Sequence, residues 1–364
     1  MKRALVVLLV LVMLSMASLA MAANEHTNEN LKLPEELTKE ELMQLYRKYN
    51  VTENDIKFAK GELPHYLEGT ILGSNKIVVV AESGNIPEKL KNKLEKRRMD
   101  YIVLSYKEML DIVEKARKSY IEKYGVDPRD PRAEVLNGVV LPKEYVRELA
   151  VNNMLKIDSG DGFKMNTVAC GNPNAGPHAI NGVIDVWIVE AKDSAHKPDE
   201  PYMEDTITAL ERFENTYNLN MDIAFLFGIW DASDVGTSSD DLLDDLAEDL
   251  SWLIDDSNDI VLGWVRDSDR NGVAYPDGVW DLDGDNIDEY APFALNSVSA
   301  TGKPDWPHDS IVQHETSHLF GAKDQGWTAY DHPPCIMNYW YAYWGVVDIW
   351  CVDCENCIES NIYP

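Results

Sequence analysis

Basic residues are scarce in this sequence, and their scarcity is uneven. The 364 residues include 33 Lys and Arg against 63 Asp and Glu, which gives a formal net charge of -30. Charges nearly balance up to about residue 165, whereas beyond it acidic residues outnumber basic ones by roughly five to one. Such a surface repels phosphate backbones, so nucleic acid is excluded as a partner. We favour a solvated surface suited to salt or heat over one that attracts basic substrates.

Long apolar runs are lacking after the N-terminus. The run at residues 4–19 follows Met-Lys-Arg and precedes Ala-Met-Ala at 20–22, which predicts a secretory signal peptide over residues 1–22, cleaved before Ala23. A retained membrane anchor is the alternative. After cleavage we expect a secreted, extracellular protein without membrane contact.

Internal repeats are also absent, but composition divides the chain. Residues 23–157 are rich in Lys and Glu, and we interpret them as an N-terminal α/β prodomain with its own fold. Its expected helices begin at 33 and cover 87–98 and 107–124, and its expected strands cover 76–81 and 101–104. Residues 158–178 are rich in Gly, Asn and Pro, which predicts an interdomain linker open to proteolysis.

Residues 179–364 are expected to form a second, α+β domain. Its patterns predict strands at 183–189, 221–229 and 260–265 and helices at 202–217 and 242–254. A further helix is expected to start one turn before His314. Ser310 and Gln313 would form its capping box, with Asp309 at the positive end of the helix dipole.

This last helix carries the pattern H-E-x-x-H-x-x-G-x-x-D. His314 and His318, four residues apart, lie on one helical face and would bind one zinc ion, with Glu315 between them as a general base. Gly321 permits the sharp turn that brings Asp324 back as the third ligand.

The extended motif resembles the signature of the metzincin superfamily of zinc endopeptidases. That resemblance implies a twisted mixed sheet, a zinc-binding helix and a methionine-containing turn, with Met337 as the apolar floor of the site. Tyr339 matches a tyrosine that in astacin-like members stabilises the tetrahedral intermediate. The usual third ligand is histidine, and Asp324 at that position resembles the snapalysin-like minority.

Glutamate is missing where a competing zinc peptidase class needs it. That class takes its third ligand from a later helix, but the next glutamate after Glu315 is Glu355, beyond the methionine turn. Asp331 or His332 remains an alternative to Asp324 as the third ligand.

Two aspartate-rich loops precede the zinc helix. Alternating carboxylates are typical of calcium loops, although neither loop has the glutamate at the twelfth position that an EF-hand requires. Calcium binding and ordinary turns remain equally open. The candidate ligands are Asp267, Asp269, Asn271, Asp281, Asp283 and Asp285.

Cysteine is rare, with five in the chain, and four of them follow the zinc helix: Cys335, Cys351, Cys354 and Cys357. In a secreted protein we favour two disulfides, and a second, structural zinc ion is the alternative. The spacing is partly similar to the cysteine pattern of archaemetzincins.

The fifth cysteine, Cys170, stands in the linker. The sequence 170–173, Cys-Gly-Asn-Pro, resembles the core of the cysteine switch of matrix metalloproteinases, so its thiolate would block the zinc site of a precursor. A disulfide to the C-terminal cluster is an equal alternative.

Together these features predict a secreted zinc endopeptidase, made as a precursor, that acts on peptide or protein substrates. The alternative is a non-catalytic metal-binding or surface-interaction protein that retains the metzincin fold. An intact Glu315 and a matching Tyr339 favour the enzyme.

Overall fold

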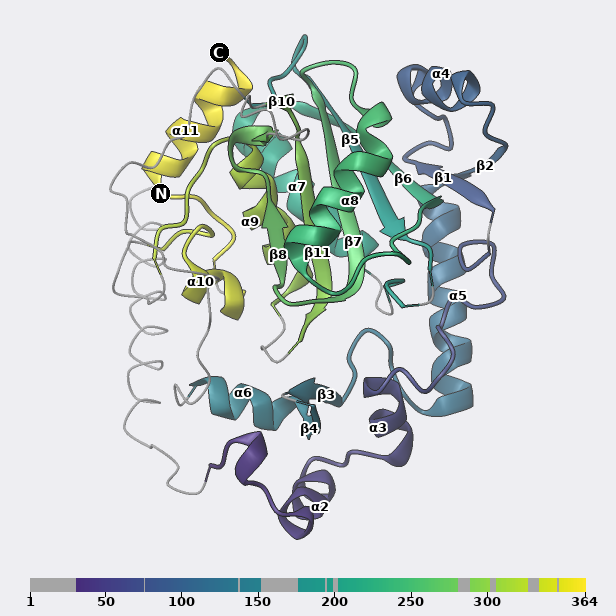
Figure 1. Ribbon diagram of the computed structural model, residues 1–364, viewed down its shortest axis with the longest axis vertical. Helices are drawn as coiled ribbons and strands as arrows, with labels where there is room; N and C mark the ends of the chain where they lie inside the picture. Colours follow the sequence, from purple (N-terminus) through teal and green to yellow (C-terminus); the bar gives the residue numbers. More distant parts are fainter. Residues whose placement is uncertain are drawn as a thin grey trace, which may run out of the picture.

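A mixed seven-stranded sheet forms the centre of the computed structural model, which describes residues 31–74, 76–136, 138–151, 176–193, 195–198, 202–280, 289–301, 306–326, 334–345 and 347–364 (Figure 1). The strand order is β2-β1-β6-β5-β7-β11-β8. The strands are β1 (Ile77–Ala81), β2 (Tyr101–Ser105), β5 (Val183–Ala191), β6 (Asn220–Trp230), β7 (Asp259–Ser268), β8 (Gly272–Ala274) and β11 (Phe293–Ala300). The run β6-β5-β7-β11 is parallel, and β8 pairs antiparallel with β11 at one edge.

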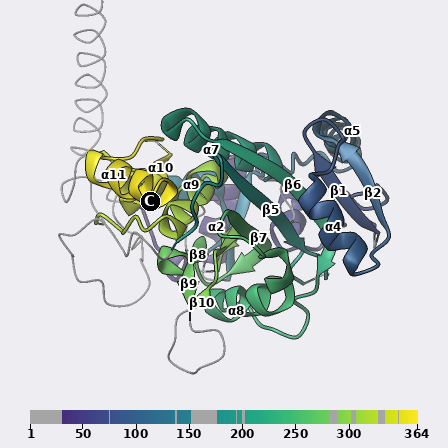
Figure 2. The ribbon, with the colours of Figure 1, turned by 90° about the horizontal axis from the view of Figure 1, so that it is seen from above.

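Helices cover both faces of this sheet (Figure 2). One face packs against α5 (Tyr106–Tyr124), α7 (Met203–Tyr217) and α9 (His308–Leu319), and the other against α4 (Glu88–Lys96) and α8 (Ser239–Leu250). Side chains alternate along each strand, so Ile184, Val186 and Ile188 of β5 enter the first core while Trp187 and Val189 enter the second. Burial on both faces explains why β5 reads as a nearly continuous apolar run.

The N-terminal segment contributes to this same sheet. Strands β1 and β2 occur where the sequence predicts them, but β1 pairs antiparallel with β6, and β2 pairs with β1. The expectation that residues 23–157 have a fold of their own is therefore wrong for this part. The reason is burial: Val78 and Val80 enter one core of the sheet and Val79 enters the other.

Buried ion pairs attach α4 to the rest of the sheet. Lys89 Nζ lies 3.0 Å from Asp185 and 2.9 Å from Asp259, and Lys93 Nζ lies 3.3 Å from Asp259. Burial alone would lower the pKa of Lys89, but the surrounding carboxylates raise it. Removing one partner of a buried pair typically costs about 3–5 kcal/mol. The N-terminal segment is thus held by strand pairing and by charge.

A small satellite lies below the sheet in Figure 1. It contains η1 (Pro34–Glu36), α2 (Lys39–Lys48), α3 (Glu53–Ala59), the hairpin of β3 (Ala133–Leu136) and β4 (Val139–Pro142), and α6 (Lys143–Val151). Thr38 and Thr52 begin α2 and α3 with complete capping boxes. Leu136, Leu141 and Leu149 belong to its separate core.

The remaining elements connect the central strands or follow α9. They are η2 (Ser251–Leu253), η3 (Pro276–Gly278), β9 (Val279–Trp280), β10 (Glu289–Tyr290), α10 (Tyr339–Trp344) and α11 (Val352–Ile362). The helix expected at 242–254 is confirmed as α8 followed by η2, and the other expected strands and helices are confirmed to within a few residues, except for the helix expected from residue 33. There η1 ends at Glu36 and α2 begins only at Lys39, because Thr38 caps it. Within the described ranges, no helix has the length and apolar character needed to span a bilayer.

Candidate metal centre

Helix α9 carries the histidines, but it begins earlier than expected. Its first residue is His308, and Pro307 occupies the N-cap position without a side-chain hydrogen bond. The expected capping box at Ser310 is therefore wrong. The Gln313 side chain instead accepts a hydrogen bond from Arg212 at 2.7 Å and donates one to the Asp348 carbonyl at 2.9 Å. Arg212 also pairs with Asp309 in the first turn.

Three ligand atoms converge on one point beside α9. His314 Nε2 and His318 Nε2 are 3.2 Å apart, and Asp324 Oδ1 lies 3.1 Å from the former and 3.4 Å from the latter. Asp324 Oδ1 is buried without a hydrogen-bond partner, which is the state expected of an atom that binds a cation. This donor set, two imidazoles and one carboxylate with an open side, fits catalytic zinc.

Backbone carbonyls fix both imidazole rings. His314 Nδ1 lies 2.9 Å from the Ile336 carbonyl oxygen, and His318 Nδ1 lies 2.8 Å from that of Ala322. Each Nδ1–H therefore donates outward, which leaves the Nε2 lone pair for a metal. The carbonyl of Ile336 comes from the turn that contains Met337, so this turn orients a ligand.

Gly321 reverses the chain after α9. Its φ is +80°, the left-handed region that favours glycine. The Gly321 amide donates to the His318 carbonyl, and the Ala322 amide donates to the Ser317 carbonyl, which is the pattern of a Schellman C-cap. The same turn delivers the Ala322 carbonyl to His318 and brings Asp324 to the ligand cluster.

Charge in the cluster favours cation binding. Burial alone would raise the pKa of Asp324, but the imidazoles of His318 and His314 hold it far below its usual value, so the carboxylate is ionised. Burial opposes protonation of His318, yet Asp324 raises its pKa to about 9. Metal binding would displace that proton. Asp331 and His332, the alternative third ligands, lie outside the described residues.

Tyr339 contacts the carboxylate ligand directly. Its hydroxyl donates a hydrogen bond to Asp324 Oδ2 at 3.0 Å, and its ring lies 5.3 Å from that of His314. Burial and the Asp324 charge raise the pKa of Tyr339 well above its usual value, so the hydroxyl stays a donor. In this arrangement Tyr339 orients a ligand, a role that the sequence did not predict.

Glu315 is buried beside the ligands, with 6% of its surface exposed. Burial raises the pKa of its carboxyl, and the imidazoles of His314 and His318 partly oppose this. A carboxylate with a raised pKa in this position is suited to accept a proton from a water molecule and to release it later. Met337 is fully buried in the apolar cluster that contains Ile311 and Leu319 of α9.

Cys335, Cys351, Cys354 and Cys357 form no disulfide with one another, so the two expected disulfides are not observed. The sulfur atoms of Cys335, Cys351 and Cys354 lie within 4.8 Å of one another. A hydrogen bond between the thiols of Cys335 and Cys351 raises the pKa of Cys335 to about 12, because it favours the protonated form of Cys335. Cys357 lies apart from this trio and donates its S–H to the Gly321 carbonyl at 3.2 Å.

The first aspartate-rich loop does not support a calcium site. Asp269 Oδ1 accepts from the Ser239 amide at 2.8 Å, and Asn271 Oδ1 accepts from the Trp306 amide at 3.0 Å. These oxygens satisfy separate backbone donors, as in ordinary turns. Asp267 belongs to strand β7. Asp281, Asp283 and Asp285 lie outside the described residues, as do Cys170 and residues 1–22, where a signal peptide is expected.

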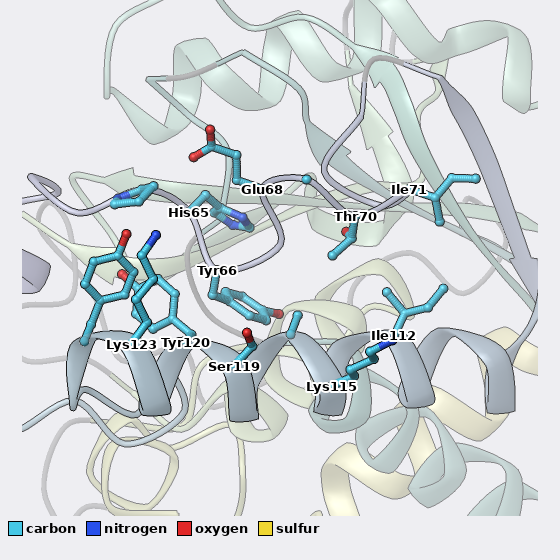
Figure 3. Close-up of a pocket in the computed structure, with 14 residues that line it drawn as sticks. His65, Tyr66, Glu68, Thr70, Ile71, Ile112, Lys115, Ser119, Tyr120 and Lys123 are labelled. Carbon is cyan, nitrogen blue, oxygen red and sulfur yellow. The ribbon is translucent and has the colours of Figure 1, made fainter.

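A cavity of about 760 Å³ lies elsewhere, between residues 64–71 and helix α5 (Figure 3). Its lining residues include His65 and Lys115, and none of them belongs to the metal cluster. Burial lowers the pKa of His65 to about 4, so the ring is neutral there, next to the Pro198 carbonyl. We assign no chemistry to this cavity.

Comparisons with known proteins give weak structural similarities. No family model and no curated protein matches the chain. Among solved structures, an archaemetzincin from Methanopyrus kandleri is 16% identical, with a TM-score of 0.30 over 50% of this chain and 96% of that one. Metalloproteinase-II from Bacteroides fragilis is 15% identical, with a TM-score of 0.36 over 69% of this chain and 70% of that one.

Proposed function

We propose that this protein is a zinc-dependent endopeptidase of the metzincin type. The observation that carries the proposal is the convergence of His314 Nε2, His318 Nε2 and Asp324 Oδ1, with the carboxylate of Glu315 buried beside them. Weak structural similarity adds nothing to this argument, which rests on the geometry of the side chains.

Each residue of the site has a separate role in the proposed hydrolysis of a peptide bond. Bound zinc would polarise the scissile carbonyl and lower the pKa of a water molecule. Glu315 accepts a proton from the attacking water and later donates it to the leaving amide nitrogen. The carbonyls of Ile336 and Ala322 keep both histidines oriented during this cycle. The hydroxyl of Tyr339 orients Asp324, and it would stabilise a developing oxyanion only by turning its proton away from that carboxylate.

We expect the purified protein to contain zinc and to cleave casein. A chelator should abolish cleavage, and added zinc should restore it, because the metal would supply the polarisation of the carbonyl and the activation of the water. Metal analysis measures the zinc content, and a casein assay measures the rate of cleavage. A protein that binds zinc but cleaves no peptide substrate would support the alternative, a non-catalytic metal-binding or surface-interaction protein.

Secretion as a precursor is a separate proposal. Strand pairing and the Lys89 and Lys93 ion pairs hold the N-terminal segment in place, so cleavage within 158–175 should not release it. Inhibition of the precursor would then depend on the Cys170 thiol and not on the whole N-terminal segment. Gly176 lies against the carbonyl of Leu319, the residue after His318. Cys170 precedes Gly176 by six residues, which span at most about 20 Å, so its thiol would be within reach of the proposed zinc site.

If Cys170 blocks the site, Cys170→Ser should make the uncut precursor active, whereas the natural precursor should be latent. After cleavage of the linker, both fragments should still elute together from a sizing column. A latent, less stable Cys170→Ser precursor with a new reactive thiol in the C-terminal cluster would indicate a disulfide instead. Fragments that separate would contradict the proposed attachment.

We also propose a second metal ion at the thiol trio. Cys335, Cys351 and Cys354 resist joint ionisation unless a cation compensates their charge, and zinc prefers such sulfur ligands. We expect two zinc ions per chain, and one in Cys351→Ser with the catalytic zinc retained. One zinc ion in the unaltered protein, together with disulfides detected by thiol titration, would contradict this.

A further inference from the structure

Strand β8 approaches the proposed base very closely at Gly272. A Cβ atom at this position would lie 2.6 Å from Glu315 Cγ, 2.6 Å from Oε1 and 2.9 Å from Cδ. Such distances are below van der Waals contact, so a Cβ atom at this position would push the Glu315 side chain aside. The absence of a side chain at Gly272 therefore leaves the carboxylate where it lies.

The backbone at Gly272 is held in place and cannot easily retreat. Gly272 pairs with Asn296 of β11, and the preceding carbonyl of Asn271 accepts from the Ser297 amide at 2.8 Å. The Asn271 side chain accepts from the Trp306 amide. The ring of Trp306 in turn meets the ring of His314 edge-on, at a centroid distance of 5.5 Å. Asn271 thus holds Trp306, which contacts His314, and the next residue, Gly272, lies against the base.

We infer that Gly272 is a positioning residue for Glu315. Its bare backbone forms a wall that fixes where the carboxylate lies, and it does so without touching substrate or metal. The expected loss of kcat rests on the proposed function. The steric contact itself belongs to the folded protein, so it can be tested without activity.

We expect Gly272→Ala to displace the Glu315 carboxylate and to lower kcat by roughly 10- to 100-fold, with KM and zinc content nearly unchanged. Gly236→Ala is the matched control, because a Cβ there meets nothing within 4 Å. Gly263→Ala is the second control: its Cβ would meet Leu246 Cδ2 at 2.6 Å, in the core on the face of the sheet opposite α9. It should lower the melting temperature and leave kcat near that of the unaltered protein.

A double-mutant cycle measures the contact through stability alone. Introduced into the natural sequence, Gly272→Ala should lower the melting temperature. Introduced into the Glu315→Ala variant, it should lower the melting temperature much less, because the overlapping side chain is absent. Equal losses in both backgrounds, or an unchanged kcat in Gly272→Ala, would overturn the inference. Absence of chelator-sensitive cleavage in the unaltered protein would refute the proposed function, and the stability cycle would still decide the contact.

Discussion

Replacing Glu315 with glutamine should lower kcat by roughly two to four orders of magnitude while zinc remains bound. Glutamine keeps the size of the side chain but cannot accept the proton from water, and the three ligands are untouched. Steady-state kinetics and metal analysis of the same sample test this. Near-normal turnover would refute the role of Glu315 as the base.

The matched control is Glu190→Gln. Glu190 is also buried, with 2% of its surface exposed, but its carboxylate accepts from Tyr202 and lies 3.4 Å from Lys197. This variant makes the same chemical change away from the ligands, so zinc binding and kcat should persist even if stability falls. Loss of activity in both variants would indicate a general effect of removing a buried charge.

The pH profile gives a further test of the same base. Burial raises the pKa of Glu315, and its carboxyl group can accept a proton only when it is ionised. Activity should therefore fall as the pH drops through this pKa. The midpoint of the acidic limb of kcat/KM should lie above the usual glutamate value, about 4.3.

Replacing Asp324 with alanine should raise the dissociation constant for zinc by more than roughly 100-fold, beyond the usual effect of an outer-sphere change. Asp324 is the ionised member of the cluster, and its removal leaves two imidazoles for the metal. Competition with a chromogenic chelator measures the affinity.

Further variants compare how much Asp324 and its neighbours contribute to zinc affinity. Tyr339→Phe removes the hydrogen bond to Asp324 Oδ2, so zinc affinity should fall by about 10- to 100-fold. Changes at Asp331 or His332 should have mild effects or none. If zinc affinity depended more on Asp331 or His332 than on Asp324, the ligand assignment would be wrong.

Local sequence was sufficient to predict the ligand-bearing helix. The spacing of His314 and His318 depends on one helical turn, and Gly321 is needed because the next residues must reverse direction. The strands at 76–81 and 183–189 were predictable for a similar reason, since short apolar runs bounded by turn residues have few other solutions. The start of α9 was predicted wrongly because Gln313 and Asp309 bind Arg212 from α7, and this tertiary contact replaces the expected cap.

Sequence by itself determined the candidate site of this protein: two histidines, a proposed base between them, a glycine turn and a candidate third ligand within eleven residues. Tertiary structure alone decided which distant backbone completes the site. The carbonyl of Ile336 orients His314, and Gly272 confines Glu315 from a different strand. It also decided that β1 joins β6 and that three thiols meet. The physical reason is that local patterns set dihedral angles and faces, whereas strand partners and close approaches depend on long-range burial that no short window of sequence contains.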